Sequence, residues 1–139
     1  MRLSEADARE RLAAARSLRL ATVGADSRPH LVPITFAVEG ELIYTAVDFK
    51  PKSTRELRRL RNIEGNPRVA LLADAYSDDW DTLWWVRVDG SAQVLTDADA
   101  MRHPIDVLAA RYAQYRACRP DGPVIVIRAE RWTGWTGAH

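Results

Sequence analysis

Cysteine and lysine are nearly absent from this sequence, which contains only Cys118 and, among its 20 basic residues, only Lys50 and Lys52 as lysines. A single cysteine excludes an intrachain disulfide and fits a reducing compartment. The formal net charge of +1 gives no overall basic field, which is unlike proteins that bind nucleic acid by covering its phosphates. A site for an anion would therefore have to be local.

Long apolar segments and targeting signals are also missing. No apolar run approaches the roughly 20 residues that are needed to cross a bilayer. The opening segment MRLSEADARE has neither the apolar core of a signal peptide nor the composition of a transit peptide. We therefore expect a soluble, cytoplasmic protein that binds neither membrane nor nucleic acid.

Motifs for metal ions and for phosphate-binding loops are absent as well. The histidines His30, His103 and His139 are far apart, and no Cys/His pair has metal-ligand spacing. None of the seven glycines falls in a G-x-G-x-x-G, G-x-x-x-x-G-K or G-x-S-x-G pattern. The sequence predicts no metal site, no dinucleotide or P-loop site and no nucleophile elbow.

What is present indicates one domain, residues 1–139, with a hydrophobic content of 47% that is enough for a substantial core. Ser4 precedes a run of good helix formers, which predicts a capped helix within residues 1–17. Apolar runs rich in β-branched residues then predict strands: LRLATVG, HLVPITFAV, LIYTAV, RVALLADAY, TLWWVRVDGSAQVL and PVIVIRA. About six antiparallel strands with inserted helices indicate an α+β, mainly β, barrel over residues 18–139.

Several residues interrupt this pattern. Pro33 removes a donor from its strand, which predicts an open or irregular sheet edge. The long strand is expected to break near Gly90. After it, Asp97 is suited to cap a short turn and Pro104 to open a longer helix. The apolar residues of this helix fall three or four apart: Ile105, Leu108, Tyr112 and Tyr115.

The two lysines flank Pro51 directly before a predicted helix. Ser53 and Glu56 have the spacing of a capping box, which places the helix start at Ser53. The first helical turn offers unpaired N–H groups and a positive dipole end, and the hydroxyls of Ser53 and Thr54 add donors. This loop suits a phosphate group. The simpler interpretation, a helix cap beside solvated lysines, stays open on these residues alone.

The ordered set of motifs resembles one known family. A run LATVGADSRPHLVPITFAVEGELIYTA is followed by a loop with Lys and Ser, a helix ending NPRVALL, then WWVRVDGSAQVL and VIRAERWTGW. In this order, over residues 18–135, they resemble the pyridoxamine 5′-phosphate oxidase-like split-barrel proteins, especially their deazaflavin-dependent branch of coenzyme F420-dependent reductases. The resemblance implies a six-stranded antiparallel split β-barrel of the FMN-binding type. It also implies a homodimer with two cofactors in grooves between the subunits.

The resemblance further implies which residues bind the cofactor. The tricyclic ring would lie along the strand at Pro33, Ile34 and Thr35. The phosphate end would lie at Lys50, Lys52, Ser53, Thr54 and Arg55. Flavin-binding relatives tend to read Ser-Arg-Lys-Ala where this chain reads Pro-Lys-Ser-Thr, and this departure favours coenzyme F420, with FMN as the alternative. The longer anionic tail of a deazaflavin would suit the arginines of the next helix: Arg55, Arg58 and Arg59.

Aromatic residues near two strands are further candidates for this groove. Strand alternation turns Trp85 and Arg87 to one face, and we expect both to line the groove; the alternative is a surface tryptophan stacked by an arginine for packing. Trp132 and Trp135 are suited either to cover the cofactor ring or to plug the barrel end. His30 is given no role, because most histidines in strands are simply polar residues.

The function that the resemblance implies is hydride transfer from a reduced deazaflavin to an unsaturated small-molecule substrate, which makes the protein an F420-dependent reductase. No catalytic residue is assigned, because the cofactor carries the chemistry and the protein contributes position, a dry groove and electrostatics. Two alternatives remain: an FMN-dependent oxidoreductase of the same fold, and a non-catalytic protein that binds flavin or deazaflavin.

Overall fold

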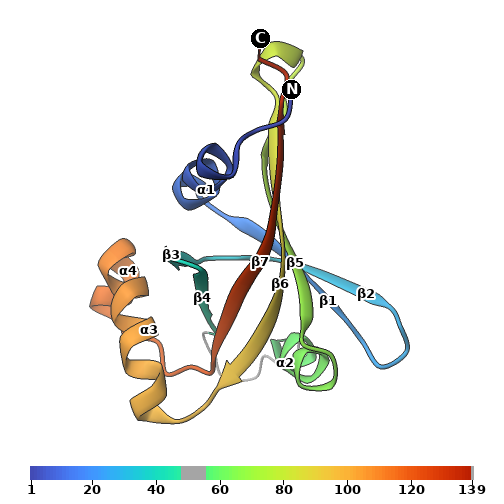
Figure 1. Cartoon of the computed structure of the whole chain (residues 1–139). Coiled ribbons are helices and arrows are strands. Elements are labelled where there is room, and N and C mark those ends of the chain that lie inside the picture. The colour runs from blue at the N-terminus through green and yellow to red at the C-terminus, as the bar shows by residue number, and fades with distance from the viewer. Residues whose placement is uncertain (48–55, 139) are drawn as a thin grey trace.

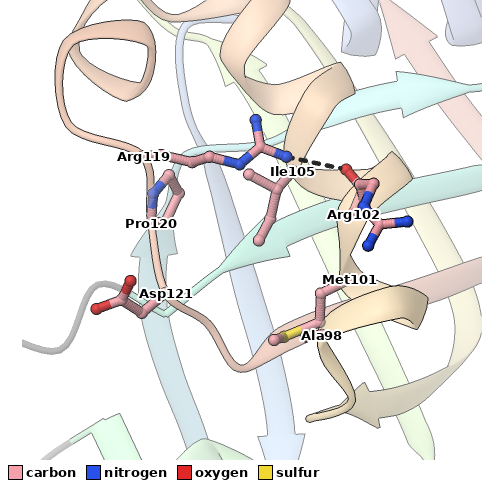
Figure 2. Close-up of a pocket in the computed structure, with 7 residues that line it drawn as sticks. All are labelled: Ala98, Met101, Arg102, Ile105, Arg119, Pro120 and Asp121. Carbon is pink, nitrogen blue, oxygen red and sulfur yellow. Dashed lines mark hydrogen bonds between the residues drawn. The ribbon is translucent and has the colours of Figure 1, made fainter.

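The computed structural model describes residues 1–47 and 56–138 (Figure 1). Its elements are α1 (Glu5–Ala14), β1 (Leu18–Val23), β2 (Pro29–Ile34), β3 (Ala37–Glu39), β4 (Leu42–Ala46), α2 (Glu56–Gly65), β5 (Arg68–Ala75), the 3₁₀ helix η1 (Trp80–Thr82), β6 (Trp84–Leu95), α3 (Ala98–Arg111), α4 (Ala113–Ala117) and β7 (Val124–Thr136). Within the described ranges, seven strands form one antiparallel sheet in the order β2-β1-β5-β6-β7-β4-β3. The predicted mainly β split-barrel fold with flanking helices is confirmed, but the predicted number of six strands is wrong.

The additional strand arises because the predicted strand HLVPITFAV is divided. Its first part pairs as β2 with β1, and its last part pairs as β3 with β4. Thr35 and Phe36 lie between the two parts, where the chain passes from one edge of the sheet to the other. The sheet curls into a half-barrel whose edge strands are consecutive in the sequence. Pro33 lies on the edge strand β2, as predicted, where a missing N–H is tolerated.

The core lies between the curled sheet and its helices. Its largest fully buried side chains come from α1, the strands, the β2–β3 link and α3; they include Leu12, Leu20, Phe36, Ile43 and Leu108. Helix α1 begins after Ser4, whose hydroxyl accepts a hydrogen bond from the Asp7 N–H at 3.1 Å, as the predicted cap requires. In Figure 1, α3 and α4 lie to the left of β6 and β7, and α2 lies to the right of the lower part of β6. In the described ranges, no helix is long and apolar enough to span a membrane.

Strand β6 is continuous rather than broken near Gly90. Its register with β7 shifts between Asp89 and Gly90, which is a local irregularity within one long strand. A Cβ atom on Gly90 would lie 2.4 Å from the carbonyl oxygen of Arg128. Glycine is therefore required here because the two backbones approach too closely for a side chain.

We expect Gly90→Ala to destabilise the fold, because the added methyl group must displace the backbone of β7. Overpacking of this kind costs about 1–3 kcal/mol of unfolding free energy, which chemical denaturation would measure. Gly65→Ala is the matched control, since a Cβ there meets nothing within 4 Å. Equal stability of the two variants would contradict this reading of the β6–β7 contact.

Helix α3 differs from the prediction in its start and its end. It begins after Asp97, whose carboxylate accepts a hydrogen bond from the Ala100 N–H at 3.0 Å, and Pro104 lies inside the helix instead of opening it. The cap at Asp97 decides the start because it satisfies a free N–H of the first turn. The helix ends at Arg111, so Tyr112 is its C-cap and Tyr115 belongs to α4.

Candidate functional site

The loop predicted to bind the phosphate end of the cofactor lies outside the described residues, and so do its candidates: Lys50, Lys52, Ser53, Thr54 and Arg55. The described helix next to it, α2, carries Arg58 on an exposed position and Arg59 on a half-buried one. Both guanidinium groups act on the imidazole of His30, which lies on β2. Positive charge from α2, which packs against β1, therefore lies near the edge strand β2.

His30 lies on the inner side of this edge. Burial lowers the pKa of its imidazole, and the charges of Arg58 and Arg59 lower the pKa further. Its Nδ1 atom is buried and has no hydrogen-bond partner among the described residues. Thr22 pairs with His30 across the strands, and the Thr22 hydroxyl accepts a hydrogen bond from Asn62 Nδ2 at 3.0 Å. Helix α2 is thus attached to the sheet beside a neutral histidine that the sequence analysis left without a role.

We expect His30 to make folding less favourable in acid. Its pKa is lower in the folded protein than the ordinary value of 6.5, so the unfolded chain binds the proton first as the pH falls. The free energy of unfolding should then decrease below about pH 6.5. An NMR titration of the His30 ring gives the folded pKa, and His30→Gln should remove this part of the pH dependence. A folded pKa at or above 6.5 would refute the expectation.

The predicted ring-binding residues Pro33, Ile34 and Thr35 lie where β2 ends. Pro33 and Thr35 are exposed, whereas Ile34 is only 5% exposed and packs in the core. Ile34 can therefore offer a ligand only its backbone. The hydroxyl of Thr35 lies 2.7 Å from the hydroxyl of Tyr115 on α4. Because β2 is an edge strand, the sheet leaves backbone groups on its free side available to a planar ligand.

The other predicted groove residues, Trp85 and Arg87, lie on a different strand. They belong to β6, on the side of the sheet opposite the core, which we call the outer face. The pairing register places five residues of this face in one row across β2, β1, β5, β6 and β7: Pro33, Arg19, Leu72, Arg87 and Thr133. With strands roughly 4.8 Å apart, Pro33 and Arg87 are about 14 Å apart along the sheet. A single chain therefore does not bring the predicted ring-binding residues of β2 together with Trp85 and Arg87 of β6.

The register also separates the two C-terminal tryptophans. Trp135 pairs with Trp85, so both side chains lie on the outer face. Trp132 pairs with the buried Val88 and lies on the inner side, where the guanidinium of Arg9 on α1 is 4.8 Å from its ring centroid. Of the two, Trp135 is therefore the one placed beside the predicted groove residues, while Trp132 packs beneath α1.

Charge and apolar surface alternate on the outer face. The Arg87 guanidinium lies 5.7 Å from the Trp85 ring centroid, and its Nε lies 3.4 Å from the Asp89 carboxylate. Between β2 and β6 the face carries an apolar strip of half-buried or exposed residues, Ala21, Val23, Leu31, Ala70 and Leu72. An ion pair between Arg19 on β1 and Asp74 on β5 lies on the same face. Leu31 is 65% exposed. The apolar strip therefore runs from β2 to β5, and Asp74 lies between it and Trp85.

A curled antiparallel half-barrel whose consecutive strands β2 and β3 form its two edges, with helices on its flanks, places the chain in the split β-barrel class. The family model of pyridoxamine 5′-phosphate oxidase matches residues 4–136. The chain belongs to this family.

Comparisons with individual proteins agree with the fold. Among curated proteins, the chain is 33% identical over 87 residues to a 5a,11a-dehydrotetracycline/5a,11a-dehydrooxytetracycline reductase of Streptomyces rimosus. The matched residues make up 62% of this chain and 60% of that relative. The match thus spans about three fifths of the relative's length.

Solved structures match almost the whole chain. A FAD-binding protein from Mesorhizobium loti superimposes with a TM-score of 0.73 at 22% identity, covering 96% of this chain and 95% of that one. A conserved hypothetical protein from Mycobacterium tuberculosis gives a TM-score of 0.74 at 24% identity, covering 97% and 86%. At these identities the structural matches establish the fold.

Proposed function

We propose that this protein is an oxidoreductase that uses coenzyme F420 to reduce an unsaturated small-molecule substrate. The observation that carries the proposal is the 33% identity to a reductase of dehydrotetracyclines, within a family whose fold the chain adopts. FMN on the same scaffold is the alternative cofactor. The predicted cytoplasmic location belongs to the same proposal.

The described residues fit a cofactor with a long anionic part. Burial lowers the pKa of His30, and the positive charges of Arg58 and Arg59 beside it lower the pKa further. In the sequence, α2 directly follows residues 48–55, which contain both lysines of the chain. An anionic tail there would be attracted by the charges of Arg58 and Arg59. The free edge of β2 provides the adjoining surface for a flat ring.

The proposed groove needs two copies of the chain. Pro33 and Arg87 are separated by β1 and β5, so both contact one ring only if they come from different subunits. The apolar strip of the outer face, with the exposed Leu31, is the kind of surface that a two-fold partner covers. In such a homodimer, Pro33 and Thr35 of one subunit would face the partner's Trp85 and Arg87.

Different residues of the chain would then have different roles in the reaction. A reduced deazaflavin, when bound, would supply a hydride ion. The free edge of β2 would orient the ring, and Trp85 and Trp135 would exclude water from the groove. The guanidinium of Arg87 would stabilise negative charge that develops on a conjugated carbonyl oxygen of the substrate.

A turnover assay distinguishes the proposed reductase from a non-catalytic protein that only binds the cofactor. The test follows the absorbance of reduced coenzyme F420 with pure protein and a panel of conjugated enones, against a protein-free control. Oxidation of the cofactor that depends on both protein and enone supports the proposal. Tight F420 binding without turnover on any enone would instead indicate a non-catalytic deazaflavin-binding protein.

A further inference from the structure

The link between β2 and β3 is held by side chains from α3 and its C-terminal cap. The Tyr112 hydroxyl accepts a hydrogen bond from the Phe36 N–H at 3.0 Å and donates one to the Phe36 carbonyl oxygen at 2.9 Å. Arg111 Nη1 donates to the same carbonyl oxygen at 3.0 Å, and its Nη2 donates to the carbonyl of Ala15. Since Phe36 lies between the two edge strands, these side chains provide bonds that the sheet ladder does not.

The same residues also fix the side chains around the link. The Phe36 ring is fully buried, and the Arg111 guanidinium lies 4.4 Å from its centroid. The rings of Tyr112 and Tyr115 meet edge to face, with centroids 5.4 Å apart. The Tyr115 hydroxyl lies 2.7 Å from that of Thr35. We call Arg111, Tyr112 and Tyr115 the Phe36 clamp.

The Phe36 clamp lies next to the proposed ring-binding segment of β2. It holds the residue that directly follows Pro33, Ile34 and Thr35, the proposed ring-binding segment, and it holds the Thr35 hydroxyl as well. The free side of an edge strand lacks the second neighbour that would fix its conformation. Without the clamp, this end of β2 would have to become ordered when the cofactor binds.

We infer that Arg111, Tyr112 and Tyr115 are positioning residues, which order the end of β2 before the cofactor ring binds. This inference rests on the proposed function and adds residues from α3 and α4 that do not line the proposed groove. Preorganisation of a binding surface raises affinity because less conformational freedom is lost on binding. The clamp therefore acts on affinity through Phe36 and Thr35.

Tyr112→Phe tests the inference, because it keeps the ring and removes both hydroxyl bonds to Phe36. Its matched control is Tyr44→Phe, which removes a hydroxyl that donates to Glu39 at 2.8 Å. The Tyr44 ring is buried in a cluster with Met101 and Leu108, against which Tyr112 and Tyr115 also pack. Tyr44→Phe keeps this ring packing and removes only a hydroxyl that makes no bond to Phe36 or Thr35. Affinity for coenzyme F420 is measured by fluorescence titration at a temperature at which every variant is folded, together with amide hydrogen exchange at Phe36.

We expect Tyr112→Phe to weaken F420 binding about three- to tenfold and to speed exchange of the Phe36 amide. Tyr44→Phe should leave both quantities at the parent values, even where it lowers the melting temperature. Should Tyr112→Phe fail to fold, Tyr115→Phe replaces it, since this change removes only the bond to Thr35; it should also weaken binding.

Two results would overturn the inference, and they differ. If the parent protein binds F420 and the clamp variant binds it equally well, the clamp has no positioning role while the proposed function stands. If the parent protein does not bind F420 at all, the proposed function fails and the inference fails with it.

Discussion

Replacing both loop lysines, Lys50→Ala together with Lys52→Ala, is expected to weaken binding of coenzyme F420 strongly while the protein stays folded. Each lysine would form a charge-assisted hydrogen bond with the anionic part of the cofactor. Such bonds contribute about 1.5–3 kcal/mol, so each single change should lower affinity roughly ten- to a hundredfold. The loss should shrink at high salt, because ions screen the attraction.

Fluorescence titration at low and high salt measures this effect. Arg102→Ala is the control, since it removes the same charge from an exposed position on α3, where the Arg102 guanidinium forms an ion pair with Asp99. It should leave affinity nearly unchanged. Parent-like affinity of the double lysine variant at low salt would show that the lysines are solvated loop charges with no part in binding.

The second large effect is expected at the outer face, where Leu31→Asp should dissociate the homodimer. Leu31 is 65% exposed in the single chain, so a polar residue there leaves the subunit folded. In a two-fold interface the same carboxylate would be buried without a partner, which costs several kcal/mol. Because the proposed groove needs both subunits, F420 binding should be lost along with the dimer.

Light scattering at micromolar concentration gives the mass of the parent and the variant. Ala6→Asp is the control, because Ala6 is exposed on α1, which packs against the other side of the sheet. It should remain dimeric. If the parent protein is monomeric, both the proposed homodimer and the shared groove are wrong. If Leu31→Asp remains dimeric, the interface does not include Leu31.

Local signals predicted those parts of the fold that depend on a few neighbouring residues. Ser4 caps a helix because its side chain reaches the free N–H group three residues on, and Pro33 indicated an open sheet edge because it lacks a donor. Asp97 was predicted only to cap a short turn, whereas it caps the whole of α3. The division of one predicted strand at Thr35 and Phe36 had no such signal. It depends on Tyr112 and Arg111, which are more than 70 residues away along the chain.

In the candidate site, too, the features that depend on residues distant in the sequence could not be predicted. Alternation along β6 placed Trp85 and Arg87 on one face, which the register confirms. The sequence did not show that two strands separate them from Pro33, because strand order is decided by distant pairing. The effect of Arg58 on His30 was missed for the same reason, since a helix and a strand must pack before their charges meet.

The cofactor assignment is best tested by equilibrium binding of coenzyme F420 and of FMN to the same pure protein, measured side by side. We expect F420 to bind more tightly than FMN, with one site per chain, and the protein to be purified without bound FMN. A protein that is purified yellow, retains FMN and does not bind F420 would contradict it.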